Sequence, residues 1–105
     1  MRFDPDVVAR LRRDLMRRGL SLATLLSQVL AGKRPPQLAA LLALRPGMRP
    51  EEVLRLALDQ IETRRKLLDR ADDRFGRCDA CGVDLGATAL GDMPWADRCQ
   101  AHAAG

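Results

Sequence analysis

The chain is poor in aromatic residues and rich in leucine, alanine and arginine. Its 105 residues include two phenylalanines, one tryptophan and no tyrosine, so a hydrophobic core must be built mainly from aliphatic side chains. Strand-forming residues are also scarce before residue 78, and the prevailing residue types favour helix. The sequence therefore predicts a mainly α-helical protein.

Long apolar runs are missing as well. No stretch approaches the roughly eighteen uncharged apolar residues of a membrane-spanning helix. The N-terminus reads M-R-F-D-P-D-V-V and lacks the apolar segment of a secretory signal. We therefore expect a cytoplasmic protein without membrane contact, in a compartment where thiols stay reduced and can bind metal.

Cysteine and histidine are rare, and all of them fall in one short segment. Cys78 and Cys81 form a C-x-x-C pair, and Cys99 and His102 follow as C-x-x-H. Two residues between ligands allow a tight turn in which both side chains converge on one ion, and Gly82 can supply the positive φ of such a turn. This donor set suits one tetrahedral zinc ion per chain.

Other uses of these cysteines fit the pattern less well. A redox C-x-x-C expects a βαβ surround, which the sequence does not show. A disulfide agrees poorly with three cysteines and no secretion signal. Four protein ligands close the coordination shell, whereas a catalytic zinc keeps one position for water. The pattern predicts a structural zinc, with His102 as the ligand nearest the fraying end of the chain.

The surroundings of these ligands resemble the C4 zinc finger of the DksA/TraR family of bacterial transcription regulators. The likeness runs from about residue 60 to residue 102 and includes the C-x-x-C-G motif, the spacing between ligand pairs and a P-x-A segment. The matching residues are Phe75, Gly76, Cys78, Cys81, Gly82, Leu85, Leu90, Pro94, Trp95, Ala96 and Cys99. His102 stands where the family usually has cysteine, and Ala89 where it usually has arginine.

The resemblance implies a regulator that binds RNA polymerase and performs no catalysis. Family members insert a helical hairpin with an acidic tip into the secondary channel of the polymerase, and the finger is a structural base beside the hairpin. In this chain the tip would fall in residues 45–50, which are basic and proline-rich. Glu51 and Glu52 follow directly, but acids in a first helical turn are expected because they offset the helix dipole.

Apolar periodicity predicts a small bundle of about four helices in residues 1–72, followed by a zinc finger in residues 73–105. Gly19 is expected to end the first helix and Gly32 the second, with Ser21 capping the second. The expected helices cover residues 5–18, 21–31, 37–44 and 50–72, of which the last is the longest.

The finger itself is too short in apolar residues to build a core of its own. We expect two knuckle turns or a tiny hairpin over residues 78–92, and a short helix from about residue 96. Phe75 is expected to pack against the first turn. Metal binding would then supply the free energy that folds this segment.

Two further interpretations come from the helical part. Residues 21–44 are so apolar that they could form a groove or dimer face for a protein partner, as in a zinc-stabilised adaptor, although the same leucines can form a bundle core. Residues 1–77 carry 17 Lys/Arg and 10 Asp/Glu, which allows a nucleic-acid partner or an ordinary solvated surface. The candidate nucleic-acid contacts are Arg10, Arg12, Arg13, Arg17 and Arg18.

DNA binding is not favoured, because aromatic residues for base stacking are missing and the finger lacks a long helix to read a groove. An enzyme is not predicted either. The sequence shows no open metal site, no nucleophile with a free histidine and no phosphate-binding loop, since Gly82, Gly86 and Gly91 belong to the finger turns.

Overall fold

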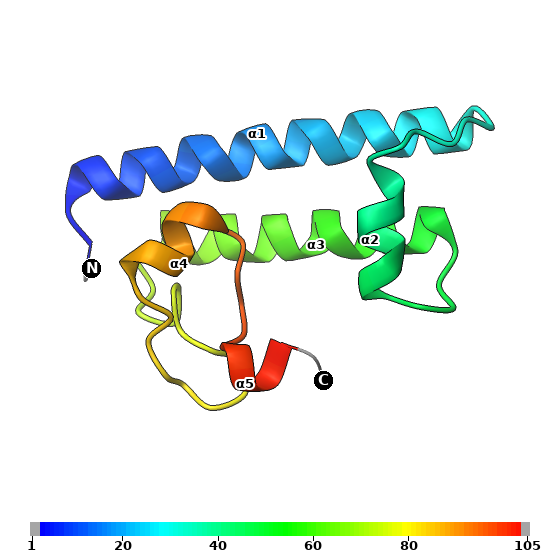
Figure 1. The fold of residues 1–105 in the computed structure, drawn as a ribbon. Helices are drawn as coiled ribbons and strands as arrows, with labels where there is room; N and C mark the ends of the chain where they lie inside the picture. Colours follow the sequence, from blue (N-terminus) through cyan, green and yellow to red (C-terminus); the bar gives the residue numbers. More distant parts are fainter. Residues whose placement is uncertain (1–2, 104–105) are drawn as a thin grey trace.

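The computed structural model describes residues 3–103 and is mainly helical, as predicted. Helix accounts for 62% of the described residues, which contain five helices and no strand. The helices, shown in Figure 1, are α1 (Pro5–Leu30), α2 (Leu38–Leu44), α3 (Pro50–Asp69), α4 (Ala87–Asp92) and α5 (Gln100–Ala103).

Two long helices form the body of the molecule. Figure 1 shows α1 and α3 side by side and running in opposite directions, as an antiparallel hairpin. An ion pair agrees with this pairing: Nε of Arg12 in α1 lies 2.9 Å from Oδ1 of Asp69 at the end of α3. The short helix α2 packs on α3 at the distal end, where α1 ends and α3 begins. The C-terminal segment folds against the opposite end.

The predicted break at Gly19 is wrong, and so is the helix start at Ser21. Helix α1 continues through both positions and extends over 26 residues, which makes it longer than α3. A Cβ at Gly19 would lie 3.5 Å from Cγ2 of Ile61 in α3. Glycine therefore sits where the two helices approach closely, and their packing outweighs its poor helix propensity of about 1 kcal/mol.

One hydrophobic core joins the hairpin to the C-terminal segment. In α1 the buried residues follow one another at intervals of four, seven and three, which keeps them on one side of the helix, and we call them the inner stripe: Leu11, Leu15, Leu22 and Leu25. They cluster with Leu54, Ile61 and Leu68 of α3 and with Phe75 and Leu90 beyond it. The core thus runs across the boundary at residue 72 that the sequence suggested between two units.

Helix α3 ends three residues earlier than expected, at Asp69. Ala71 adopts the left-handed conformation with φ of 52°, and the Asp72 amide donates to the Leu67 carbonyl at 2.9 Å. These features form a Schellman-type helix end, with alanine where glycine is usual. The Asp72 carboxylate then accepts hydrogen bonds from the backbone and side chain of Arg74, which lower the pKa of Asp72 to about 2.

The C-terminal segment differs in detail from the predicted finger. Residues 87–92 form α4 instead of a turn, because Leu90 is buried in the common core. The expected tiny hairpin is reduced to a single antiparallel bridge between Arg77 and Asp84. The last helix begins at Gln100 and not near residue 96. Within residues 3–103, no helix combines the length and the apolar composition needed to cross a membrane.

Replacing Gly19 with alanine should stabilise the protein. We expect Gly19→Ala to raise the free energy of unfolding by about 0.5–1 kcal/mol, because the site is helical and the new methyl group makes an ordinary contact with Ile61. Urea denaturation followed by circular dichroism measures the change. Gly19→Ile, which overfills the same contact, should lower stability by about 1–3 kcal/mol. A loss of stability in Gly19→Ala would contradict a continuous α1.

Candidate metal centre

The first pair of cysteines lies in a tight backbone turn. The Gly82 amide donates to the Cys78 carbonyl at 2.8 Å, and the Cys78 amide donates to the Val83 carbonyl at 2.9 Å. Gly82 has a φ of 77°, which confirms the positive φ expected at this position. The turn therefore places Cys78 and Cys81 on one side of the loop.

The second pair of candidate ligands is brought to the first by a backbone contact. The Asp79 amide donates to the Asp97 carbonyl at 2.7 Å, which ties the first turn to the segment before Cys99. One turn of chain then follows, in which the His102 amide donates to the Cys99 carbonyl at 2.9 Å. This turn directs both side chains toward the first pair.

The four predicted ligands lie together. Their ligand atoms are all within 4.8 Å of one another, so Cys78, Cys81, Cys99 and His102 could bind one metal ion. Sγ of Cys81 is 3.7 Å from Sγ of Cys99. Nδ1 of His102 is 3.1 Å from Sγ of Cys99 and 3.8 Å from Sγ of Cys78. All three cysteines are free, so the structure contains none of the disulfides that the sequence left open.

The cysteines differ in exposure and in acidity. Cys78 is buried, whereas Cys81 is exposed. Backbone hydrogen bonds, of which the one from Cys99 is strongest, lower the pKa of Cys78 to about 6. The Val83 amide lowers the pKa of Cys81, but partial desolvation of its sulfur and hydrogen bonds to the other two thiols outweigh this effect, so the pKa is raised. Cys78 is thus mostly thiolate at neutral pH, the form that binds metals.

A buried arginine attaches this turn to the hairpin. Nη2 of Arg64 in α3 lies 3.2 and 3.1 Å from the two carboxylate oxygens of Asp79, between the first two cysteines. Arg64 is only 3% exposed, and its Nε and Nη1 have no hydrogen-bond partner among the described residues. Asp79 is therefore the group that compensates a buried positive charge.

Two further contacts hold the segment before Cys99. The guanidinium of Arg18 in α1 lies over the Trp95 ring, 4.7 Å from its centroid. Burial lowers the pKa of Arg18, which still remains a cation at neutral pH. Nε2 of Gln60 in α3 donates to the Trp95 carbonyl at 3.0 Å. Both helices of the hairpin therefore bind the same tryptophan residue.

The buried Phe75 anchors the entrance to the segment. It packs edge-on against Phe3 with ring centroids 6.0 Å apart, and it is completely buried in the common core. The ring contact with Phe3 adds an attachment that the sequence did not predict, whereas packing of Phe75 against the turn that carries Cys78 stays a prediction. We call residues 76–103 the metal-binding segment, after its candidate ligands. Phe75, directly before it, thus links it to the N-terminal end of the chain and to the core between α1 and α3.

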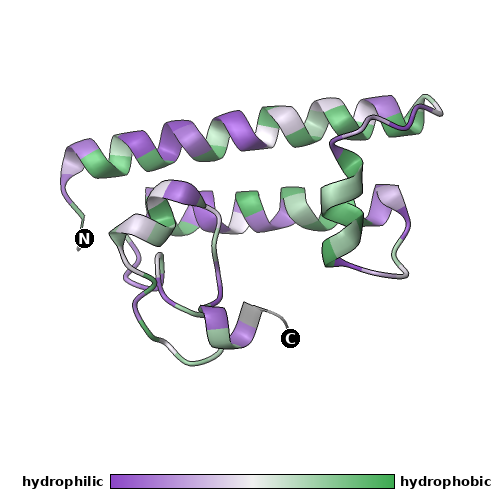
Figure 2. Cartoon of the chain, viewed as in Figure 1, coloured by the Kyte–Doolittle hydropathy of each residue, from purple (hydrophilic) through white to green (hydrophobic). Residues whose placement is uncertain are grey.

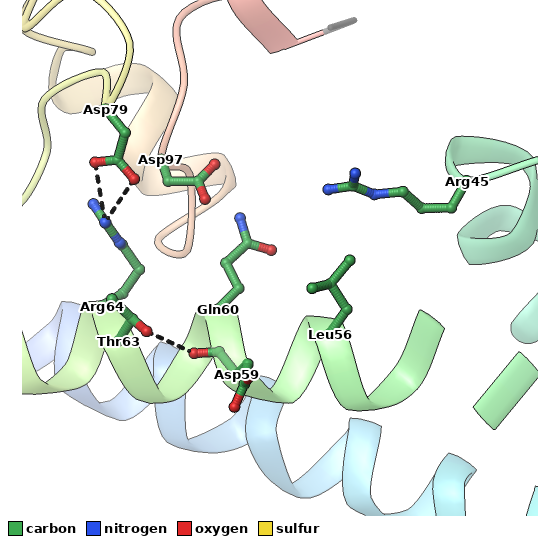
Figure 3. Close-up of a pocket in the computed structure, with 8 residues that line it drawn as sticks. All are labelled: Arg45, Leu56, Asp59, Gln60, Thr63, Arg64, Asp79 and Asp97. Carbon is green, nitrogen blue, oxygen red and sulfur yellow. Dashed lines mark hydrogen bonds and ion pairs between the residues drawn. The ribbon is translucent and has the colours of Figure 1, made fainter. Parts of the chain in front are cut away.

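A shallow groove separates the metal-binding segment from the middle of α3. Figure 3 shows Gln60 and Arg64 on α3 facing Asp79 and Asp97, with Arg45 reaching in from the end of α2. The groove has a volume of about 260 Å³ and is also lined by Leu56, Asp59 and Thr63. Its charged residues are of both signs, and two of them, Arg64 and Asp79, already form an ion pair. The groove is therefore the boundary along which the metal-binding segment packs on α3.

Of the five arginines proposed as nucleic-acid contacts, two have partners within the chain and three are exposed. Arg12 pairs with Asp69, and Arg18 is engaged by Trp95. Arg10, Arg13 and Arg17 remain exposed on α1. The groove or dimer face predicted over residues 21–44 is partly occupied by the protein's own core. Leu38 is buried, and Leu41 and Leu42 are half-buried, so these side chains are less accessible to a partner.

The contacts of Arg18 and Arg64 were not predicted, although the sequence contains a signal for both. In α1, positions 11, 15, 18, 22 and 25 follow the helical repeat, and only position 18 is charged. In α3 the same is true of position 64 between 61 and 68. An arginine within an apolar stripe indicates a polar partner elsewhere in the chain.

No family model, curated protein or solved structure matches the chain. The likeness to DksA/TraR fingers therefore rests on the residues around the metal-binding segment, without support from a wider match.

Removing Asp79 should destabilise the protein more than removing the whole ion pair. We expect Asp79→Ala to lower the free energy of unfolding by about 1–3 kcal/mol, because it leaves a buried guanidinium without a partner. The half-exposed Asp79 keeps this value below that of a fully buried pair. The double variant Arg64→Met with Asp79→Ala should recover most of the loss.

The control is Asp59→Ala, which removes an exposed carboxylate from the same groove. Chemical denaturation of all four proteins measures the differences. A double variant that is no more stable than Asp79→Ala would contradict the role of Asp79 as counter-charge.

Proposed function

We propose that Cys78, Cys81, Cys99 and His102 bind one structural zinc ion. A tetrahedral ion with metal–sulfur bonds of about 2.3 Å holds its sulfurs about 3.8 Å apart. The sulfurs of Cys81 and Cys99 lie 3.7 Å apart, which fits an ion of this size. Three thiols and an imidazole are donors that zinc prefers, and four protein ligands leave no position for a substrate.

The ion would close a segment that has few other internal contacts. Of residues 76–102, only Gly76, Cys78, Leu90 and Pro94 are buried. Zinc binding would replace the missing core, as in other small metal-binding modules. It would also fix Asp79 and Trp95 where α1 and α3 contact them.

Protein purified without added metal should contain one zinc ion per chain by elemental analysis. Cys78→Ser should contain none and should keep most of its helical circular dichroism, because α1 and α3 hold most of the core. Its unfolding midpoint should fall by about 10 °C or more, because Phe75 and Leu90 lose their fixed positions in that core. Asp92→Ser, an exposed change in the same segment, is the control. Unchanged metal content in Cys78→Ser would contradict the site.

We further propose that the protein is a DksA/TraR-like regulator that acts through protein contacts, with RNA polymerase as the partner that the resemblance implies. The observation that supports this proposal is the long antiparallel hairpin of α1 and α3 with the candidate zinc site at its base. The interrupted helices expected from Gly19 would not have offered such a hairpin. The proposed regulator would act without catalysing a reaction.

The distal end of the hairpin supports a second candidate function, that of an adaptor unrelated to polymerase. Residues 31–49 join α1 to α3 and contain Lys33, Arg34, Arg45 and Arg49 but no acidic residue. An acidic tip is what the polymerase mechanism of the resembled family uses. A basic tip would need a different partner or a different contact.

Binding to core RNA polymerase separates these two functions. If the protein is a polymerase-binding regulator, the intact protein should co-sediment with purified core enzyme in glycerol gradients. Cys78→Ser should co-sediment more weakly, because the base of the hairpin is loosened. Asp92→Ser should bind as the unchanged protein does. Absence of co-sedimentation at low and at physiological salt would reject the polymerase partner and leave the adaptor.

A further inference from the structure

Helix α1 carries a second row of apolar and small residues on its exposed side. Met16, Leu20 and Leu30 are 58%, 65% and 60% exposed, and Ala23 and Ser27 between them are exposed too. The intervals are four, three, four and three residues. We call this row the outer stripe.

The outer stripe does not belong to the core. The inner stripe of Leu11, Leu15, Leu22 and Leu25 already faces α3. Each outer position except Ala23 follows an inner-stripe residue by five positions, and Ala23 follows Arg18, which lies on the same side of the helix as the inner stripe. Five residues turn an α-helix by about 140°, so the outer stripe points away from the core. Alternating steps of three and four are the spacing by which one helix packs along another. Small residues at its middle permit a close approach.

The charge around the outer stripe is of one sign. Residues 15–50 contain six Lys/Arg and no Asp/Glu. Within the described residues 3–103, no ion pair involves Arg13, Arg17 or Lys33. By contrast, arginines of α3 pair with neighbouring carboxylates, as Arg55 does with Glu51. Asp14 is the one acidic residue in residues 10–34, and within the described residues it forms no ion pair with these basic side chains, which therefore remain unpaired beside the outer stripe.

We propose that the outer stripe binds an amphipathic helix of a partner protein, with apolar residues at heptad spacing and acidic residues on both sides of them. Leucine and methionine at the centre would be buried against the apolar residues of that helix. Arginine and lysine at the rim would pair with its carboxylates, which sets specificity and speeds association.

Other occupants fit the same surface less well. In an antiparallel pair of two copies centred on Ala23, Arg13 of one copy would face Lys33 of the other, and a parallel pair would place Arg13 beside Arg13. Both arrangements bring like charges together. A nucleic acid would leave Leu20 and Leu30 against phosphates, and the stripe has no aromatic residue for base stacking.

This inference deepens the proposed action through protein contacts and rests on it. It names the chemistry of the partner but does not require that the partner be polymerase. Binding of polymerase without binding of an acidic helix would reject this inference alone. Binding of an acidic helix without polymerase would reject the polymerase partner alone.

The test uses the full chain and two synthetic peptides of three heptads each. Both peptides carry leucine at the heptad core positions; one has glutamate at the flanking positions and the other has lysine. Fluorescence anisotropy of labelled peptide measures Kd. We expect the glutamate peptide to bind at least about tenfold more tightly than the lysine peptide, with an advantage that shrinks as salt increases.

Leu20→Gln should raise Kd for the glutamate peptide by about tenfold or more, because it removes the central apolar contact. The matched control is Leu44→Gln, which changes a leucine of α2 that is 75% exposed and outside the outer stripe; its Kd should stay unchanged. Both variants alter exposed side chains, and circular dichroism should show full helicity for each.

Three results would overturn the proposal. The first is equal binding by the unchanged protein and Leu20→Gln, and the second is equal affinity for the two peptides. The third is a stable dimer in sedimentation velocity that Leu20→Gln abolishes, which would assign the stripe to a second copy of the chain.

Discussion

The packing of the inner stripe of α1 against α3 is the interaction on which the rest of the structure depends. Leucines spaced by three and four residues give each helix one apolar side, and burying each leucine contributes roughly 2 kcal/mol. Gly19 lets the helix axes approach at Ile61, so α1 stays continuous where local propensity alone favours an end. The resulting hairpin offers a long surface to a C-terminal segment that has little core of its own. Figure 2 shows apolar and polar residues alternating along the two hairpin helices and apolar residues prevailing in α2.

Two arginines within the apolar stripes decide where the C-terminal segment docks. A guanidinium at a core position is unfavourable unless another part of the chain satisfies it. The Trp95 ring covers the Arg18 guanidinium in a cation–π contact, and the Asp79 carboxylate forms an ion pair with Arg64. These partners lie in the two halves of the metal-binding segment, one near each ligand pair. The hairpin therefore selects one orientation of that segment through charge and ring contacts as well as through buried area.

Sequence spacing predicted which candidate ligands lie close together better than it predicted the helices. Cys78, Cys81, Cys99 and His102 could be grouped because ligand spacing is a local property, and the positive φ of Gly82 is equally local. The continuity of α1 could not be predicted, because the contact that outweighs the glycine comes from Ile61, more than forty residues away along the chain. Helix α4 was missed for the same reason, since burial of Leu90 in a distant core stabilises it. Where long-range packing competes with a local signal, the packing determines the result.

Metal binding at the candidate site would be coupled to the stability of the hairpin, although no candidate ligand comes from α1 or α3. Asp79 lies between two of the ligands, and its amide bonds to the segment that leads to the other two. If the metal-binding segment opens, Arg64 of α3 loses the Asp79 carboxylate that balances its charge, and Leu90 leaves the core that it shares with α1 and α3. The closed segment thus stabilises the hairpin through an ion pair and through a common core. An ion that binds only the closed form therefore stabilises the whole hairpin, by an amount that depends on its affinity and concentration. This coupling would link the supply of metal to the shape of the surface that a partner protein meets.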